Sequence, residues 1–233
     1  MSYRVLALFL AIGLGVTASP DPARAAQNTV TVYAGGQFGF SNYGYLGGTF
    51  ALPGSSIGNG FAIRTVGFTG GYDYLHSSTL VHAYFSGAEV DALYQFSSKD
   101  FWNEFSAGAR YADTSLSPYD PTNRRRGSQV EFAAGVDGGT VSGPWRVDWY
   151  GSYGTFLEDY AARLSLTHTL APGVRFGAEG YAEGDPTYDL RQVGPYLGIG
   201  LGANAELQFS GGFSWQTGRG SRPYLRASVY STF

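Results

Sequence analysis

Apolar and polar residues alternate along most of this chain, in segments of about ten residues or more that turn-forming residues separate. In PWRVDWYGSYG, for example, Trp145, Val147 and Trp149 fall on one face of an extended chain. Arg146 and Asp148 fall on the opposite face. A period of two residues is typical of a β-strand with one apolar and one polar face. Because the segments that follow repeat this pattern, the chain is predicted to be built almost entirely of β-strands.

About twelve such strands can be counted from the alternation and from the turn residues between the segments. They cover roughly residues 29–40, 43–52, 60–74, 80–96, 101–113, 128–141, 144–154, 160–170, 174–184, 191–202, 205–216 and 222–233. Each strand is long enough to cross a bilayer when it is tilted. The third strand has no single clean phase, and we predict a β-bulge in it near Gly67.

The connections between these strands differ in length. Short connections lie at 97–100, 141–144, 171–172 and 202–204, and longer or more polar ones lie at 113–127, 184–190 and 217–221. Outer-membrane barrels have short turns on the periplasmic side and longer loops on the external side. The pattern therefore predicts an all-β, antiparallel transmembrane β-barrel of about 12 strands, with both termini on the periplasmic side.

The composition agrees with a barrel, since glycine supplies 35 of 233 residues and aromatic residues make up 16% of the chain. Disordered chains are poor in aromatic residues, whereas many glycines suit a strongly curved sheet. The alternative is a soluble β-sandwich or lipocalin-like barrel, which packs Leu, Ile and Val inward. Here the apolar face is rich in aromatic residues, Ala and Gly, and the polar face carries many charges. We therefore prefer the membrane barrel.

The first 25 residues have the features of a cleaved signal peptide. A short basic start precedes an apolar run over residues 5–18, which is too short to cross a bilayer stably. Ala23 and Ala25 occupy the two positions that a signal peptidase reads. We expect residues 1–25 to be removed and residues 26–233 to form the barrel in the bacterial outer membrane. The chain has no cysteine, so disulfides play no part in closing the fold.

If the apolar face meets lipid, the polar face lines the lumen of the barrel. The side chains that we expect there are Glu89, Asp91, Glu104, Arg110, Glu131, Asp137, Arg146, Asp148, Arg163, Arg175, Glu179, Glu183, Glu206 and Arg226. Acidic and basic residues are interleaved in this set, and unpaired charges in a confined lumen are costly. We favour a network of paired charges that fills the barrel. A charged channel that selects solutes is the alternative.

Two further candidate sites lie outside the lumen. Arg124, Arg125 and Arg126 form a run of charge in the longest predicted external loop, where they would contact lipopolysaccharide phosphates or an anionic glycan. A solvated loop without a ligand is the alternative. Phe233 ends the closing strand on its apolar face and resembles the signal by which outer-membrane barrels are recognised for assembly. We therefore expect outer-membrane lipid, lipopolysaccharide and the barrel assembly machinery as partners.

Residues suited to catalysis or metal binding are few. His76 and Ser78 have a spacing that occurs in some lipid A deacylases, but no nearby acid is clearly placed to orient the histidine. The three histidines are scattered and cysteine is absent, so no metal site is predicted. A net charge of -3 provides no general field to attract nucleic acid. We predict no cofactor, no nucleic-acid partner and no enzymatic activity.

Two stretches of the chain carry a resemblance to a known family. They are GFAIRTVGFTGGYDY (60–74) and VGPYLGIGLGANAELQFSGGFSWQTGRGSRPYLRASVYSTF (193–233). The first stretch has an arginine followed by Gly and paired Tyr. The second has a Gly-Pro pair near its start and a final Pro-Tyr strand that ends in Phe. They resemble the cellulose biosynthesis protein BcsS family of alphaproteobacteria. The resemblance implies a non-enzymatic outer-membrane barrel that assists cellulose or exopolysaccharide biosynthesis and secretion. It also implies cellulose or another glycan, and components of the cellulose synthase complex, as partners.

Two other functions remain open at this point. A small general porin or adhesion barrel would have the same alternation and the same charged lumen. A lipid A-modifying barrel enzyme would use His76 and Ser78. The resemblance carries over no catalytic residues, and none is assigned.

Overall fold

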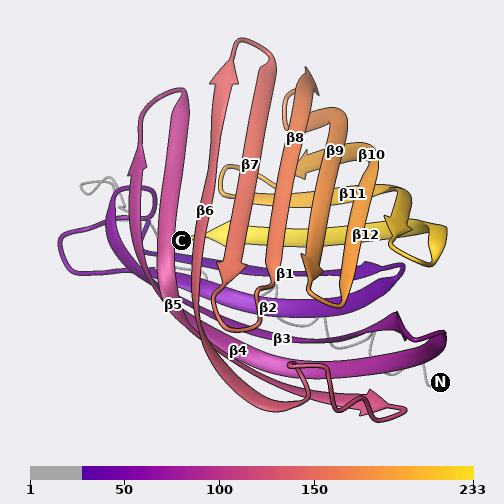
Figure 1. The fold of residues 1–233 in the computed structure, drawn as a ribbon. Coiled ribbons are helices and arrows are strands. Elements are labelled where there is room, and N and C mark those ends of the chain that lie inside the picture. The colour runs from indigo at the N-terminus through magenta and orange to yellow at the C-terminus, as the bar shows by residue number, and fades with distance from the viewer. Residues whose placement is uncertain (1–27) are drawn as a thin grey trace.

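Twelve antiparallel strands close into a barrel in the computed structural model, which describes residues 28–233 (Figure 1). The strands are β1 (Val30–Phe38), β2 (Ser41–Ala51), β3 (Gly60–His76), β4 (Thr79–Ser97), β5 (Phe101–Ser117), β6 (Gly127–Ser142), β7 (Trp145–Gly154), β8 (Tyr160–Ala171), β9 (Val174–Asp185), β10 (Tyr188–Gly200), β11 (Ala205–Gln216) and β12 (Gly220–Thr232). Each strand pairs with its neighbours along the chain, and β1 pairs with β12 to close the sheet. The predicted all-β antiparallel barrel is confirmed. The predicted signal peptide, residues 1–25, lies outside the described residues.

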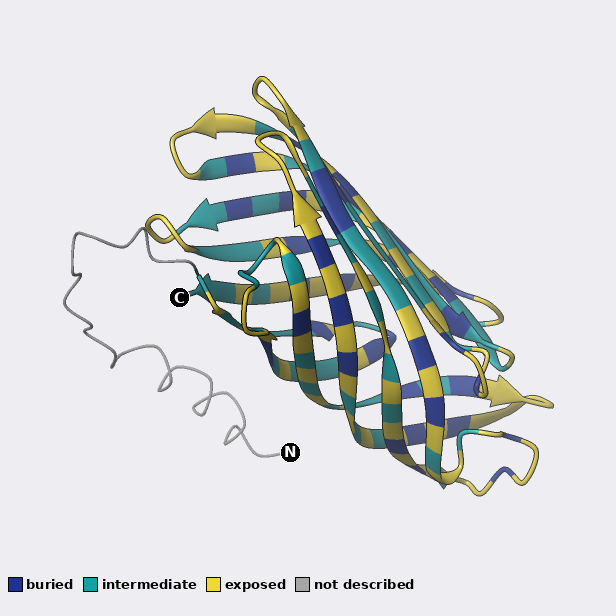
Figure 2. Cartoon of the chain, turned by 90° about the vertical axis from the view of Figure 1, so that its left-hand side faces the viewer, coloured by how far each residue is buried: buried dark blue, intermediate teal, exposed yellow. Residues whose placement is uncertain are grey.

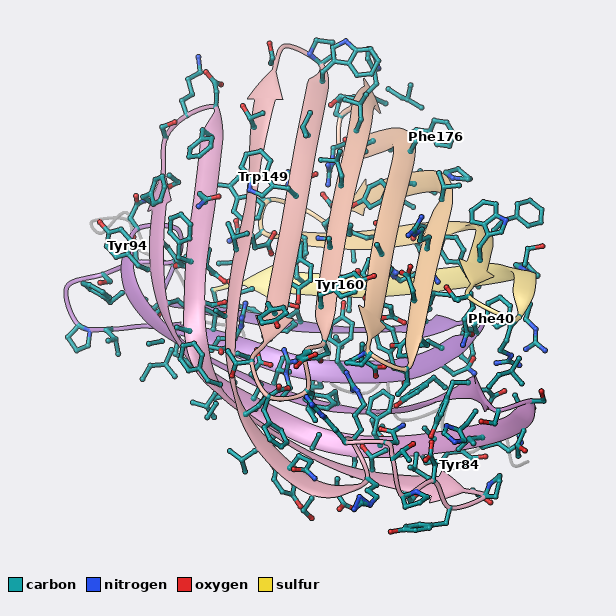
Figure 3. All side chains as sticks on the ribbon, in the orientation of Figure 1. Phe40, Tyr84, Tyr94, Trp149, Tyr160 and Phe176 are labelled. Atoms are coloured by element: carbon teal, nitrogen blue, oxygen red, sulfur yellow. The ribbon has the colours of Figure 1, made fainter. Side chains whose placement is uncertain are left out.

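The outer face of the barrel is apolar, and exposure alternates along the strands (Figure 2). Tyr84, Phe132 and Phe213 are more than half exposed. Tyr94 and Phe176 lie on the same outer face and are about half exposed (Figure 3). A soluble β-sandwich or lipocalin buries such residues, so those alternatives fail, and the outer face matches that of barrels that contact lipid. Within residues 28–233, no helix is long and apolar enough to cross a membrane.

The strands β3 to β6 are longer than the rest. They contain 16 to 19 residues, whereas the other strands contain 9 to 13. The fifth strand was predicted to end at residue 113, but its pairing with β4 continues to Ser117. Leu116 explains the difference, because it turns inward and packs against the buried cluster of Tyr72, Tyr74, Val81 and Ala83 on β3 and β4. The loop that follows therefore shrinks to residues 118–126.

The third strand shows that one local prediction is wrong. Gly67 pairs with Leu46 on β2 and with Ala88 on β4 in unbroken ladders, so there is no bulge at this glycine. The phase of β3 is unclear in the sequence because Val66 and Phe68 lie on the inner face among polar neighbours. The register shift of the barrel lies instead between β8 and β9.

We call the end of the barrel that carries both described chain ends the terminus end, and the opposite end the loop end. The loop end has connections at 39–40, 77–78, 118–126, 155–159, 186–187 and 217–219, and the terminus end has connections at 52–59, 98–100, 143–144, 172–173 and 201–204. The predicted contrast in length therefore holds for only one long loop-end connection, 118–126. Several loop-end hairpins close in tight turns because their strands run further than the polar residues suggested.

Candidate functional site

The inner face of the barrel carries every side chain that the alternation predicted for the lumen. Six of these fourteen side chains are buried, and the other eight are partly buried. The members are Glu89, Asp91, Glu104, Arg110, Glu131, Asp137, Arg146, Asp148, Arg163, Arg175, Glu179, Glu183, Glu206 and Arg226. Their contacts fall into groups that run along or across the barrel.

The first group centres on Arg64 of β3, which the sequence reasoning did not include. Its Nε donates to Asp91 Oδ2 over 2.9 Å, and its Nη1 donates to Glu104 Oε1 over 3.0 Å. Glu89 Oε1 lies 3.7 Å from Arg64 Nη2. Arg64 therefore joins three strands through carboxylates that face one another inside the barrel. It was missed because the unclear phase of β3 hid which of its residues point inward.

Arg110 of β5 extends this group toward the loop end. Its Nε donates to Glu89 Oε2 over 2.5 Å, so one carboxylate contacts both Arg110 and Arg64. Its Nη1 donates to Asp159 Oδ2 over 2.9 Å and lies 3.4 Å from Glu131 Oε1. Alternating acids and bases thus run continuously from the middle of the barrel to the turn between β7 and β8.

Arg226 of β12 holds the second group. It donates to Glu179 over 2.9 Å, to Gln37 over 2.6 Å and to Gln192 over 2.8 Å. Its guanidinium carbon also lies 4.0 Å from the ring centroid of Tyr181, which is a cation–π distance. These contacts involve β1, β9, β10 and β12, so one side chain ties together strands on both sides of the seam where the barrel closes.

A third group lies near the terminus end and is built around Asp148. Arg146 Nε donates to Asp148 Oδ1 over 2.7 Å, and Arg175 Nη1 approaches Asp148 Oδ2 at 3.5 Å. Arg175 also pairs with Glu206. A cavity of about 490 Å³ opens beside this pair and is lined by Tyr230 and by residues of the terminus-end turns.

The three groups place paired side chains along the barrel interior, whereas Asp137 Oδ1, Arg163 Nε and Glu183 Oε1 are buried without a hydrogen-bond partner in residues 28–233. Asp91, Glu131 and Glu179 are each at most 5% exposed, so water-filled space does not pass along them. A buried charge without a partner is strongly destabilising, and here each of these carboxylates has an arginine partner. At these three positions the structure favours the paired network over a channel lined by free charges.

The loop end is closed by a different kind of packing. Tyr72 and Tyr74 of β3 pack with Val81 and Ala83 of β4 in a buried apolar cluster. The ring of Tyr188, at the start of β10, stacks on Tyr72 with 4.8 Å between centroids. Since β3 and β10 are not neighbours in the sheet, this stack crosses the mouth of the barrel.

The loop 118–126 folds over this mouth instead of extending away from it. Arg125 Nε lies 2.6 Å from Asp185 Oδ2, and Arg125 Nη2 lies 3.1 Å from Asp159 Oδ2. Burial alone would lower the pKa of Arg125, but Asp185, Tyr72, Tyr188 and Asp159 together outweigh burial and raise this pKa above its ordinary value. The predicted external basic run is thus divided, because Arg125 turns inward while Arg124 and Arg126 stay at the surface.

Asp120 anchors the same loop from below. It accepts hydrogen bonds from Tyr74 Oη over 2.7 Å and from the hydroxyl and backbone N–H of Thr122 over 2.7 and 2.9 Å. Burial raises the pKa of Asp120, but these donors outweigh burial and lower it to about 2. The loop is therefore held by an ionised carboxylate that is itself only 3% exposed.

His76 and Ser78, the pair that the enzyme alternative would use, do not form a catalytic arrangement. Ser77 and Ser78 have φ values of 47° and 74°, so they are the two central residues of the tight β3–β4 turn. His76 Nδ1 lies 3.5 Å from Asp120 Oδ2, which is an acid that sequence spacing did not reveal. No hydrogen bond in residues 28–233 joins Ser78 to His76, so a nucleophile and its base are not brought together.

Two remaining predictions concern metals and the last residue. In the described part of the chain, no group of three or more His, Cys, Asp or Glu side chains is placed to hold a metal ion. Phe233 is 58% exposed, and its backbone N–H donates to Val30 O over 2.7 Å. The last described residue thus lies beside β1 at the seam of the barrel, with its ring turned outward.

Comparison with known families gives a match over nearly the whole barrel. The family model described as Cellulose biosynthesis protein BcsS matches residues 31–233. No curated protein is significantly similar to the chain.

Several solved structures share the fold at low sequence identity. The CymD monoaromatic hydrocarbon channel is 8% identical, with a TM-score of 0.56 and coverage of 89% of each chain. The COG4313 outer membrane channel from Pseudomonas putida F1 is 11% identical, with a TM-score of 0.52 and coverage of 93% of this chain and 100% of that one. The KdgM porin is 12% identical, with a TM-score of 0.51 and coverage of 87% and 99%. At such identities the likeness establishes the barrel fold alone.

Proposed function

The chain belongs to the cellulose biosynthesis protein BcsS family, and from this premise we propose that it is a non-enzymatic accessory barrel of cellulose biosynthesis and secretion in the bacterial outer membrane. The observation that carries the proposal is the family match over residues 31–233, which includes every strand of the barrel. The polymer that the accessory role concerns is cellulose or a related exopolysaccharide. The cellulose synthase complex is the proposed source of partner proteins.

The outer-membrane location is supported by the apolar outer face and by the polar, charge-filled interior. Such a barrel leaves no sheet edge exposed, which is what the hydrocarbon layer of a membrane requires. The loop end would then face the outside of the cell, where Arg124 and Arg126 can contact lipopolysaccharide phosphates. The exposed ring of Phe233 is the proposed recognition point for the barrel assembly machinery.

An accessory role fits the interior better than a general porin does. A general porin needs a continuous aqueous path, whereas the carboxylates in the middle of this barrel are buried against arginines. The alternative of a lipid A-modifying enzyme is not favoured by any contact. Ser78 is a central residue of a tight turn, and His76 pairs with Asp120 and makes no side-chain hydrogen bond to a serine in residues 28–233.

The experiment that tests the proposal is deletion of the gene in its native host. Surface cellulose is scored by dye binding and by the fraction of biofilm that cellulase removes. We expect both readings to fall in the deletion strain and to return when the gene is supplied in trans. Expression of the neighbouring genes is measured in the same strains as a control. Unchanged surface cellulose in the deletion strain contradicts the proposed function.

A further inference from the structure

A cavity at the loop end lies directly under the folded loop 118–126. Its volume is about 410 Å³, which falls in the range typical of small-molecule sites. It is lined from four parts of the chain: the end of β3, the loop 118–126, the turn between β7 and β8, and the turn between β9 and β10. The cavity is therefore formed only when the barrel is closed and the loop is folded.

The cavity has an exposed rim and a buried floor. Arg124 and Glu158 form an ion pair of 3.1 Å on the rim, with side chains 63% and 50% exposed. The floor includes Tyr74, Asp120 and Asn123, all of which are nearly fully buried. A ligand that enters past the rim would thus exchange water for buried hydrogen-bonding groups.

Among the floor residues, Asn123 says most about how the cavity could bind a ligand. Its Oδ1 accepts a hydrogen bond from the backbone N–H of Arg125 over 2.9 Å. The hydroxyl groups of Tyr72 and Tyr74 lie near this side chain, but Nδ2 makes no hydrogen bond within 3.5 Å in the described residues, and the side chain is only 2% exposed. A buried amide donor without a good hydrogen bond is costly, so a partner supplied by a ligand would stabilise it.

The charges around the cavity narrow the class of ligand. Arg124 pairs with Glu158 and Arg125 pairs with Asp185, and Asp120 adds a third carboxylate, so the lining has no excess of positive charge to hold an anion inside the cavity. The carboxylates of the lining do not form a group that could hold a metal ion in residues 28–233. What remains is a mixture of acceptors and donors that suits neutral hydroxyl groups, each of which can donate and accept hydrogen bonds.

Apolar surface completes the cavity. Leu75, Leu157 and Pro186 lie in its lining beside the carboxylates and amides. A sugar ring presents C–H groups on its faces and hydroxyl groups around its edge, and this mixed lining offers partners to both. We propose that the loop-end cavity binds a neutral saccharide, with Asn123 as the donor at its floor and Glu158 as an acceptor at its rim. This inference rests on the proposed function, which makes a β-linked glucan the saccharide to test.

The test uses the whole purified barrel in detergent, titrated with cellotetraose in a calorimeter. We expect saturable binding that is weakened about tenfold or more in Asn123→Ala, because a buried hydrogen bond to the ligand is lost. Asn42→Ala is the matched control, since Asn42 is exposed on β2 outside the cavity and its loss should leave the affinity unchanged. If Asn123→Ala does not fold, Glu158→Gln at the exposed rim is the variant to measure. We expect Glu158→Gln to weaken cellotetraose binding as well.

Three results would overturn the inference. The first is a folded wild-type barrel that does not bind cellotetraose. The second is binding that neither Asn123→Ala nor Glu158→Gln weakens, which would place the saccharide elsewhere. The third is saturable binding of inorganic phosphate in place of the sugar, which would make the cavity an anion site. Each result is independent of the deletion phenotype, so the saccharide site can fail while the proposed function stands.

Discussion

Arg226 Nη1 donates a hydrogen bond to Glu179 Oε1 over 2.9 Å, and this contact links β12 to β9 across the two strands that lie between them. The two side chains are only 9% and 1% exposed. A pair this deeply buried has lost most of its hydration, so each charge depends on the other. The barrel interior is therefore stabilised only as long as its charges stay matched.

Loss of Arg226 should destabilise the barrel strongly. In Arg226→Met, Glu179 would be left buried without its arginine, and we expect a loss of about 3–5 kcal/mol in the free energy of unfolding. Urea unfolding of the barrel in detergent micelles, followed by tryptophan fluorescence, measures this loss. Arg191→Met is the control, because its ion pair with Asp189 is exposed and should contribute about 1 kcal/mol or less. A loss for Arg226→Met no greater than that of the control contradicts the prediction.

Asp120 should make the stability of the loop end depend on pH. The pKa of its carboxyl is lowered from 3.8 to about 2 in the folded barrel, mainly because donors from Thr122 and Tyr74 outweigh burial. A lowered folded pKa stabilises the fold above the unfolded value, and this contribution is lost as pH falls from about 4 through about 2. Thermal unfolding of Asp120→Asn should therefore vary less than that of the wild type across this window. Equal slopes for the two proteins would argue against an ionised anchor.

The ion pairs of Arg125 should hold the loop 118–126 over the barrel mouth. In Arg125→Met, the contacts with Asp159 and Asp185 are lost, and we expect the loop amides to exchange with deuterium faster. The control is Arg126→Met, whose contact with Tyr119 lies at the exposed surface. Hydrogen exchange followed by mass spectrometry measures both variants. Unchanged exchange in Arg125→Met would mean that the loop does not depend on this residue.

A double substitution in the turn between β3 and β4 should stabilise the barrel. Ser77 and Ser78 both have positive φ, which asparagine and glycine adopt with less strain in a two-residue hairpin turn. We expect Ser77→Asn with Ser78→Gly to stabilise the barrel by about 1 kcal/mol in the same urea assay. We expect lipid A acylation in the host to stay unchanged, because no hydrogen bond in residues 28–233 joins Ser78 to His76. Altered lipid A in that strain would favour the enzyme alternative.

Most of the fold could be predicted from the sequence, because alternation alone determines which face of a strand is polar. The inner positions of Arg146 and Asp148 follow directly from the period of β7. The inward position of Arg64 was not predicted in the same way. Val66 and Phe68 share its inner face, so apolar and polar residues do not alternate cleanly along β3. The three groups of paired charges depend on which strands face each other across the closed barrel, and the local sequence does not contain that information.

The loop 118–126 was the least predictable part of the candidate site. A run of three arginines indicates an exposed basic surface, and two of the three do lie at the surface. Arg125 turns inward because Asp159 and Asp185 reach the barrel mouth from two distant turns. The cavity beneath this loop therefore arises from tertiary contacts, and no motif in the sequence predicts the cavity.

Planar-bilayer conductance of the purified barrel, measured without any glycan, tests the central claim most directly. If paired charges close the lumen of an accessory barrel, the wild-type protein carries no steady ion current. We expect conductance to rise in a folded Arg64→Ala, Arg110→Ala double variant, because this variant breaks the shared contact with Glu89. A steady, glycan-independent conductance of the wild-type barrel would contradict the account and favour a porin.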